Sequence, residues 1–361
     1  MDSSGSRGVV AAGHELTATA AAEVIRQGGT AIDAAIAALA MSCVCEPVLA
    51  SPGGGGFAML RDGADGSVRV IDFFPQTPAV RSTLDDGGVE EIHADFGTAT
   101  QAFHIGPATV ATPGFVHGLT ALHSHGASLS LGDLFEPAIR AARSGVTVTP
   151  FQRYLMNVVG PIVTATRGAR AVFAPGGSIL HAGETLLNPG LAAALESVAH
   201  DGGGGDLDHA IAVNQSGRGH VTEDDLATYL THERTPLSVQ IDGCLVHMNP
   251  LPAASGTLIA HTLSHLESST PVDVAEALLA TARARREAGG DLSALGSVPL
   301  RQRGTTHVSV IDADGNACAV TTSNGSGNGE LVAPFGFMPN NILGEEDVNP
   351  SSTGEWPTDT R

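Results

Sequence analysis

The chain contains 361 residues with a formal net charge of −20, and it contains no lysine. A chain of this length can bury the core of one large domain or of two smaller ones. The acidic balance argues against nucleic acid as a partner, and the lack of lysine excludes Schiff-base catalysis and P-loop phosphate binding, which both use a lysine side chain.

The cysteines and the N-terminal residues favour a cytoplasmic protein with no membrane partner. Neither the paired spacing of a metal site nor the density of a disulfide scaffold is present. We therefore expect the cysteines to be small core residues: Cys43, Cys45, Cys244 and Cys318. Residues 1–7 lack the basic and apolar regions of a signal peptide. The most apolar run, Ala34 to Cys45, is too short to cross a bilayer and predicts a buried helix.

Strand and helix signals alternate in the N-terminal part of the chain. The predicted elements are a strand at 9–12, helices at 16–26 and 31–44, and hairpin strands at 57–60 and 68–73. Gly28 and Gly29 end the first helix in the usual way, and Pro47 ends the second. A turn-rich stretch at 62–66 separates the two hairpin strands.

The middle of the chain is predicted to be helical, and strands return near the C-terminus. The predicted elements are helices at 115–124, 131–144 and near 272–286, a helix that opens at Thr222, and hairpin strands at 306–312 and 317–322. Thr222 and Asp225 fit a variant of the capping box. The glycine run at 201–206 predicts a surface loop, and residues 289–303 predict an exposed linker.

Thr305 lies where this linker meets the hairpin. A threonine hydroxyl is a poor nucleophile unless a base lies beside it, and cleavage before Thr305 would create an α-amine with a pKa of about 8 that could serve as that base. Because Gly304 has no side chain, the Thr305 hydroxyl could approach the Gly304 carbonyl for self-cleavage. The motif alone also fits an ordinary threonine-rich strand start.

Several segments, in order, resemble the γ-glutamyltransferase family of N-terminal-nucleophile hydrolases, also called γ-glutamyltranspeptidases or glutathione hydrolases. The matching segments are GGTAIDAAIA at 28–37, GGGGF at 53–57, TPG at 112–114, TEDDL at 222–226, PAASG at 252–256 and TTHVSVIDADGNA at 305–317. The resemblance implies an α+β fold, the four-layer αββα sandwich. It divides the chain into a large-subunit region, 1–304, and the start of a small catalytic subunit, 305–361.

The resemblance also implies roles for individual residues. Thr305 would be the nucleophile, Gly304 and Thr305 the processing site, and Ser323 the second hydroxyl that hydrogen-bonds the nucleophile. Asn324, or Gly325 beside it, would contact the α-amino-acid end of the substrate. Ordinary explanations remain open: a solvated serine at a strand end, and an Asn-Gly turn.

Glu345 would bind the substrate ammonium, although a solvated acidic loop would contain the same residue. No cofactor and no metal would be required. The partners would be a small-molecule amide or peptide substrate and, after cleavage, the two fragments of one precursor, which would stay associated.

Two departures from the family qualify the expected substrate. Phe74 stands where the family has an arginine that clamps the substrate carboxylate. The family also continues beyond Arg361, into further strands and a Gly-Gly-Ser turn that forms the oxyanion hole, so we expect a sandwich that is incomplete at its C-terminal end. Three hypotheses follow: a γ-glutamyl hydrolase or transferase, an amidase for another N-acyl compound as in cephalosporin acylases, and a truncated, non-catalytic product.

Other candidate sites have plainer explanations. The glycine run 53–56 lacks the lysine and the strand-loop-helix setting of a phosphate loop, and we interpret it as a tight turn beside the active site. His123 and His125 have no carboxylate or cysteine at ligand spacing, and we expect a solvent-exposed pair at a helix end. Arg301 and Arg303 fit an exposed linker better than a carboxylate clamp.

Overall fold

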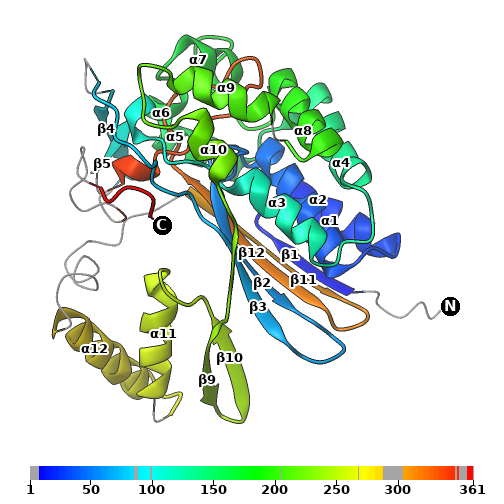
Figure 1. Ribbon diagram of the computed structural model, residues 1–361, viewed down its shortest axis with the longest axis vertical. Coiled ribbons are helices and arrows are strands. Elements are labelled where there is room, and N and C mark those ends of the chain that lie inside the picture. Colours follow the sequence, from blue (N-terminus) through cyan, green and yellow to red (C-terminus); the bar gives the residue numbers. More distant parts are fainter. Residues whose placement is uncertain are drawn as a thin grey trace.

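The computed structural model describes residues 8–84, 88–97, 100–203, 205–266, 268–287, 304–345, 348 and 356–360. Its main feature is a six-stranded antiparallel sheet with the strand order β1-β11-β12-β2-β3-β8 (Figure 1). The strands are β1 (Gly8–Ala12), β2 (Gly55–Arg61), β3 (Val68–Phe73), β8 (His232–Arg234), β11 (Gly304–Asp312) and β12 (Ala317–Gly325). The hairpin from the C-terminal part therefore lies between strands from the N-terminal part.

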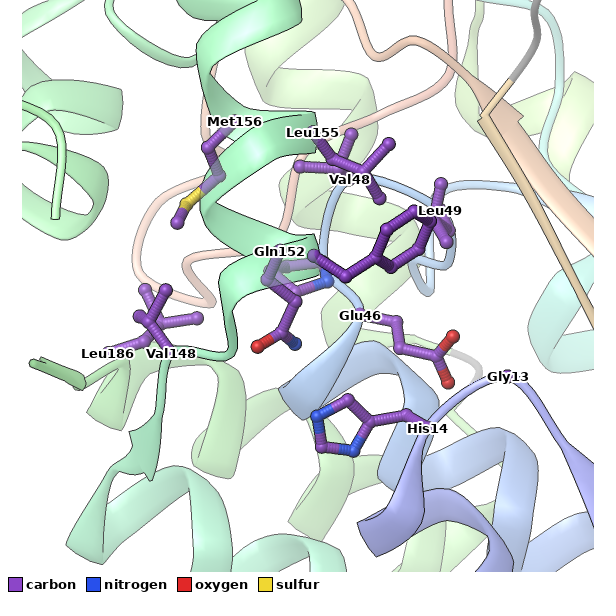
Figure 2. A pocket seen from close by; sticks show the side chains of 12 residues that line it. Gly13, His14, Glu46, Val48, Leu49, Val148, Gln152, Leu155, Met156 and Leu186 are labelled. Carbon is purple, nitrogen blue, oxygen red and sulfur yellow. The ribbon is translucent and has the colours of Figure 1, made fainter. Parts of the chain in front are cut away.

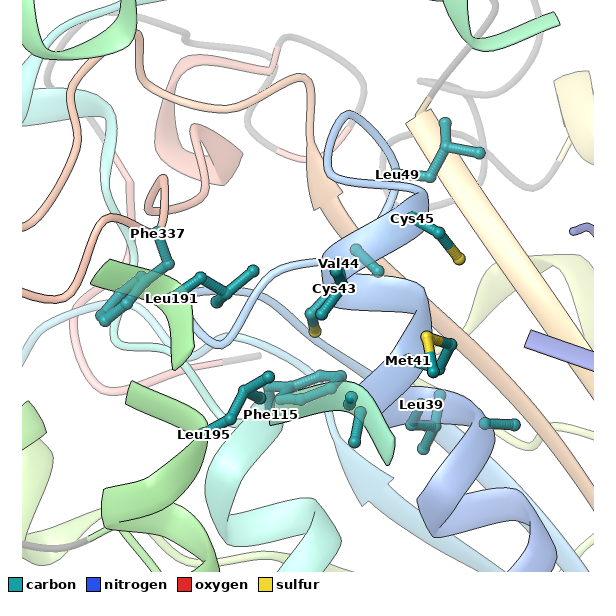
Figure 3. Close-up of a cluster of buried hydrophobic side chains, with 14 of the residues drawn as sticks. Leu39, Met41, Cys43, Val44, Cys45, Leu49, Phe115, Leu191, Leu195 and Phe337 are labelled. Carbon is teal, nitrogen blue, oxygen red and sulfur yellow. The ribbon is translucent and has the colours of Figure 1, made fainter. Parts of the chain in front are cut away.

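Helices cover one face of this sheet. Figure 1 shows α1 (Glu15–Arg26), α2 (Ala31–Cys45) and α3 (Phe115–Ser124) on the same side. Helix α2 packs against β11 and β12, and all of its residues except Ile32 are buried. A helix that is apolar on all sides is stable only when neighbours surround it. Figure 3 shows how its C-terminal half meets large side chains from other segments: Phe115, Leu191, Leu195 and Phe337.

Further helices extend this layer outward. Helix α4 (Leu131–Ser144) packs on α2, and α8 (Pro189–Asp201) packs on α4. The others are α5 (Pro150–Val158), α6 (Gly160–Val163), α7 (Arg167–Phe173), α9 (Asp206–Gln215) and α10 (Glu223–Thr228). Short strand pairs are formed by β4 (Glu90–Asp95) with β5 (Thr100–Ile105) and by β6 (Val146–Thr147) with β7 (Thr185–Leu186).

A separate group of elements follows β8. It contains the hairpin β9 (Leu237–Ile241) and β10 (Cys244–Met248), with α11 (Ala254–Ser264) and α12 (Pro271–Glu287). Figure 1 shows this group apart from the helical layer. Two short 3₁₀ helices, Pro107–Thr109 and Ile342–Gly344, complete the regular structure of the described residues.

The predicted elements agree closely with the structure, but one cysteine does not lie where it was expected. Both early helices, the helices at 115–124 and 131–144, the capping box at Thr222 and both hairpins are present. Cys244 is exposed on β10, so the expectation that all four cysteines lie in the core is wrong for that residue. Cys244 begins a two-stranded hairpin outside the main sheet, where the first two residues of β10 are exposed. The predicted linker and its arginines, Arg301 and Arg303, lie outside the described residues.

The fold class is α+β, as predicted. Of the two stacked sheets expected for a four-layer sandwich, the described residues contain one six-stranded sheet with helices on one face. Among the described helices, none is both long enough and apolar enough to cross a membrane.

Asp33 fixes the beginning of α2. It forms a capping box with Thr30, and its carboxylate also accepts hydrogen bonds from the backbone of Ser128 and Leu129 and from the Ser128 hydroxyl. Burial raises the pKa of Asp33, but the hydrogen bonds from Ser128, Thr30 and Leu129 outweigh this effect and leave the pKa lowered. The carboxylate therefore ties α2 to the loop before α4.

We expect Asp33→Asn to lower the free energy of unfolding by about 2–4 kcal/mol at neutral pH, because an amide cannot accept all of these hydrogen bonds. A carboxyl with a lowered folded pKa contributes stability above its unfolded value, and this contribution is lost as pH falls through the folded value. The gap between variant and unaltered protein should therefore shrink below the ordinary pKa of 3.8. Denaturant melts across pH measure this gap. Asp133→Asn, at the exposed N-terminus of α4, is the matched control; an equal loss there would contradict the assignment.

Candidate active site at the start of β11

The ends of four neighbouring strands lie side by side at one end of the main sheet. Because the strands are antiparallel, the beginnings of β11 and β2 lie beside the ends of β12 and β3. Thr305 on β11 lies opposite Ser323 on β12, and Ser323 in turn lies opposite Gly55 on β2. The structure thus brings the predicted nucleophile, the second hydroxyl residue and the glycine run together, as the tight-turn interpretation of that run requires.

The pairing of β11 with β12 is irregular at the predicted cleavage point. Gly304 lies opposite Gly325 and Thr305 opposite Ser323, so Asn324 is an extra residue on β12. Such bulges bend a strand locally and often occur beside active sites. A side chain could not be accommodated at Gly304, where a β-carbon would lie 2.5 Å from the Gly325 carbonyl oxygen. Thr305 itself is exposed.

Ser323 contacts the peptide bond that is predicted to break. Its hydroxyl donates a hydrogen bond of 2.5 Å to the carbonyl oxygen of Gly304 and accepts one of 3.0 Å from the backbone N–H of Gly325. A donor at this position withdraws electron density from the Gly304 carbonyl carbon and can stabilise the negative charge that forms on its oxygen during attack. The half-buried hydroxyl thus contacts the carbonyl of the bond that is predicted to break, and its role there remains a prediction.

Asn324 and Glu345 lie against the same bulge. Asn324 is fully buried, and among the described residues its side-chain oxygen and nitrogen have no hydrogen-bond partner. Gly325 has a φ of +66°, and a β-carbon there would lie 2.5 Å from Oε1 of Glu345. Only glycine permits this backbone conformation together with so close an approach. The carboxylate predicted to bind an ammonium group is thus adjacent to the junction, and the substrate roles of both residues remain predictions.

Two neighbouring asparagines position the segment that contains Glu345. The side-chain nitrogen of Asn340 donates to the carbonyls of Gly53 and Ala111, at 2.8 and 2.9 Å, and Asn341 accepts from the backbone of Ser326 at 2.8 Å. Both asparagines are fully buried. No role was predicted for either asparagine from the sequence, although an Asn-Asn pair before an acidic segment could have indicated one.

Phe74 occupies an apolar environment at the end of β3. Its ring stacks on Phe57 at 5.5 Å between centroids, and it packs with a small buried cluster that includes Ile342 and Trp356. The preceding carboxylate, Asp72, is buried and receives the guanidinium Nε of Arg234 at 2.8 Å. An aromatic side chain therefore occupies the position of the expected arginine, and the nearby Arg234 binds Asp72.

His307 follows Thr305 by two residues. Its two ring nitrogens lie 2.8 Å from the Thr321 hydroxyl and 2.9 Å from the Ser309 hydroxyl. Burial lowers the pKa of His307, so the ring is neutral at physiological pH. The contact with Thr321 links β11 to β12 just after the junction.

His123 and His125 lie at the end of α3, as predicted, but both are half-buried rather than solvent-exposed as expected. His123 contacts the carbonyl of Leu129 at 2.8 Å, and His125 contacts the carbonyl of Ala121 and the carboxylate of Glu233. Across the residues that the structure describes, no three histidine, cysteine or acidic side chains are grouped so that they could hold a metal ion.

A small cavity of about 20 Å³ lies on the helix-covered side of the junction (Figure 2). Its walls are mostly apolar and come from α5 and from the segments after β1 and α2. Three polar side chains line it, those of His14, Glu46 and Gln152. The Glu46 carboxylate reaches past this cavity to the Thr306 hydroxyl, at 2.9 Å, and so connects the helical layer to β11.

Comparisons with known proteins identify relatives of the chain. The family model for Gamma-glutamyltranspeptidase matches residues 17–291, well over half of the chain. The chain is 29% identical over 396 residues to the Acylase ACY 1 proenzyme of Pseudomonas sp. (strain V22), covering 96% of this chain and 71% of that protein. It is 28% identical to the Glutathione hydrolase proenzyme of Escherichia coli (strain K12), covering 95% of this chain and 67% of that protein.

The fold also resembles a solved structure. Cephalosporin acylase from Bacillus halodurans superposes with a TM-score of 0.73 at 23% identity, over 98% of this chain and 73% of that one. This likeness shows the fold, and the family-model match over residues 17–291 shows the family. The chain belongs to the γ-glutamyltranspeptidase family.

Proposed function

We propose that this chain carries the nucleophile of a self-processing amidohydrolase or acyltransferase, with Thr305 as the attacking residue. The observation that carries the proposal is the 2.5 Å hydrogen bond from Ser323 to the carbonyl of Gly304. The Thr305 hydroxyl attacks the Gly304 carbonyl carbon, the C–N bond breaks, and an ester forms to the Thr305 oxygen. Water then cleaves the ester, leaving a carboxylate on Gly304 and a free α-amine on Thr305.

The freed amine then supplies the base for turnover. It accepts the proton of the Thr305 hydroxyl as that hydroxyl attacks the carbonyl of a substrate amide, and the amine product leaves as an acyl-enzyme forms. Water or an amino acid releases the acyl group. The strand order supports association of the two fragments after cleavage, because the hairpin β11–β12 lies between β1 and β2, and both of these strands belong to the large fragment.

Two substrate classes fit the site. A γ-glutamyl amide such as glutathione is the first, because Glu345 lies beside the junction where an acidic group can bind the substrate ammonium. The printed names of the relatives include both glutathione hydrolase and acylase. The second class is an amide of another acyl group, and the stacked pair of Phe57 and Phe74 favours it because an aromatic surface offers nothing to a free α-carboxylate.

A pair of chromogenic anilides separates these classes. The γ-glutamyl and 4-aminobutyryl anilides differ only in the α-carboxylate, and the second keeps the ammonium group. We expect the full-length protein to prefer the 4-aminobutyryl compound. Phe74→Arg should raise kcat/KM for the γ-glutamyl compound roughly 10- to 100-fold, the effect of one bidentate ion contact. It should leave the 4-aminobutyryl rate unchanged.

Phe57→Leu serves as the control, because it removes the aromatic stack without adding a charge. If Phe74→Arg raised kcat/KM equally for both anilides, the gain would not depend on the α-carboxylate. Rapid turnover of the γ-glutamyl compound by the unaltered protein would show that another group binds the carboxylate. Absence of hydrolysis of both anilides, together with an uncut chain, would overturn the proposed function itself.

A further inference from the structure

Glu46 is a buried carboxylate at the end of α2, and it is 5% exposed. Its Oε1 accepts a hydrogen bond of 2.7 Å from the hydroxyl of Thr17 on α1, and its Oε2 accepts one of 2.9 Å from the hydroxyl of Thr306 on β11. One side chain thus joins two helices of the covering layer to the first residues of the central strand.

The beginning of β11 has backbone pairing on one side only. The register of β1 with β11 ends at Ala12 opposite Val308, whereas β12 continues to Ser323 opposite Thr305. Residues 305–307 therefore lie beyond the end of β1. Once the chain is cut before Thr305, these residues become a chain terminus held by a single ladder, and such termini fray unless something else holds them.

We propose that Glu46 is the positioning residue for the nucleophile, acting through the Thr306 hydroxyl. Thr306 is 4% exposed and its hydroxyl faces the helix-covered side, so its bond to Glu46 gives the strand a second attachment just beyond the end of the β1 ladder. Reaction rates depend on holding the attacking atom within a fraction of an ångström, and an anchor one residue away controls that position directly. This inference rests on the proposed function.

The surroundings of Glu46 suit this task. Thr17 is fully buried on α1 and fixes one carboxylate oxygen, which leaves the other aimed at Thr306. Gly13 lies so close that a β-carbon there would be 2.9 Å from Oε2 and 3.1 Å from the Thr306 hydroxyl. The carboxylate is therefore confined from several sides and cannot change its direction without moving α1 or the segment after β1.

The first test compares Thr306→Val with Thr306→Ser in the full-length protein. Valine keeps the shape and removes the hydroxyl, whereas serine keeps it. We expect Thr306→Val to lower kcat roughly 10- to 100-fold with KM unchanged, and Thr306→Ser to restore most of the loss. The substrate is whichever of the two anilides the unaltered protein hydrolyses faster. Thr281→Val, which removes a buried threonine hydroxyl on the distant α12, should leave kcat unchanged.

A direct readout is amide hydrogen exchange at residues 305–308. Loss of the anchor should raise exchange there by about tenfold or more while the centre of the sheet stays protected. The double variant Glu46→Leu with Thr306→Val should lose no more than the more impaired single variant, because both remove one interaction. The proposal is overturned if the losses in kcat of the two single variants add in the double variant. It is also overturned if Thr306→Val has the same kcat and the same amide exchange as the unaltered protein. If the unaltered protein fails to cleave, the proposed function falls, and exchange in the uncut chain still decides the anchor.

Discussion

Replacing Thr305 by alanine is expected to leave the full-length protein as one polypeptide. The variant retains the Ser323 hydrogen bond to Gly304, but it has no hydroxyl to attack the Gly304 carbonyl. Intact-mass spectrometry should find a single uncut species, where the unaltered protein gives two fragments that divide between Gly304 and Thr305. Hydrolysis of both anilides should be lost together with cleavage.

Thr321→Ala is the matched control for this prediction. Thr321 belongs to the same hairpin and contacts His307, but it does not touch the Gly304 carbonyl. It should cleave like the unaltered protein. Two fragments from Thr305→Ala, or a mass that places the break at another bond, would contradict the assignment of the nucleophile.

Removal of the Ser323 hydroxyl should slow self-cleavage roughly 10²–10³-fold, the usual cost of losing one oxyanion donor. Ser323→Ala leaves the Gly304 carbonyl without its 2.5 Å hydrogen bond, whereas Ser323→Thr keeps a hydroxyl at the same position. Cell-free synthesis followed by a chase on denaturing gels measures the rate of appearance of the two fragments. Thermal melting monitored by circular dichroism shows whether each variant has folded.

Slow cleavage in a folded Ser323→Ala protein, together with near-normal cleavage in Ser323→Thr, is the expected pattern. If a well-folded Ser323→Ala protein cleaves at the unaltered rate, the hydrogen bond to Gly304 serves only to close the bulge. The role in cleavage would then pass to another donor at the same edge of the sheet.

Much of the fold was predictable because its signals are local. Helix α2 is a continuous apolar segment between a capping threonine, Thr30, and Pro47, and its observed end at Cys45 is one residue beyond the predicted one. Strands β4 and β5 were not predicted. Their sequences, EEIHAD and TQAFHI, mix charged and polar residues with few apolar ones, and their burial is correspondingly incomplete. These segments are strands because they pair with each other in the fold, and not because apolar and polar residues alternate in their sequences.

Some residues of the candidate site could likewise be predicted from the sequence, and others could not. Resemblance to the family associated Thr305 with Ser323, and the structure places them opposite each other on the two strands of one short hairpin. Glu46 could not be found by this reasoning. Its hydrogen-bond partners are 29 and 260 residues away along the chain, so only the folded arrangement of α1, α2 and β11 brings the three side chains together.

Under the proposed cleavage before Thr305, the strand order β1-β11-β12-β2 makes refolding depend on protein concentration. Before the cut, the sheet assembles within one molecule, and the small region's hairpin finds its place between strands to which it is covalently tethered. After the cut, the same sheet joins two molecules, and a pair that has been unfolded and separated must meet again by diffusion. Recovery then becomes second order and depends on concentration, whereas the uncut precursor refolds independently of it. The uncut chain therefore directs the assembly of a sheet that remains paired after the chain is cut.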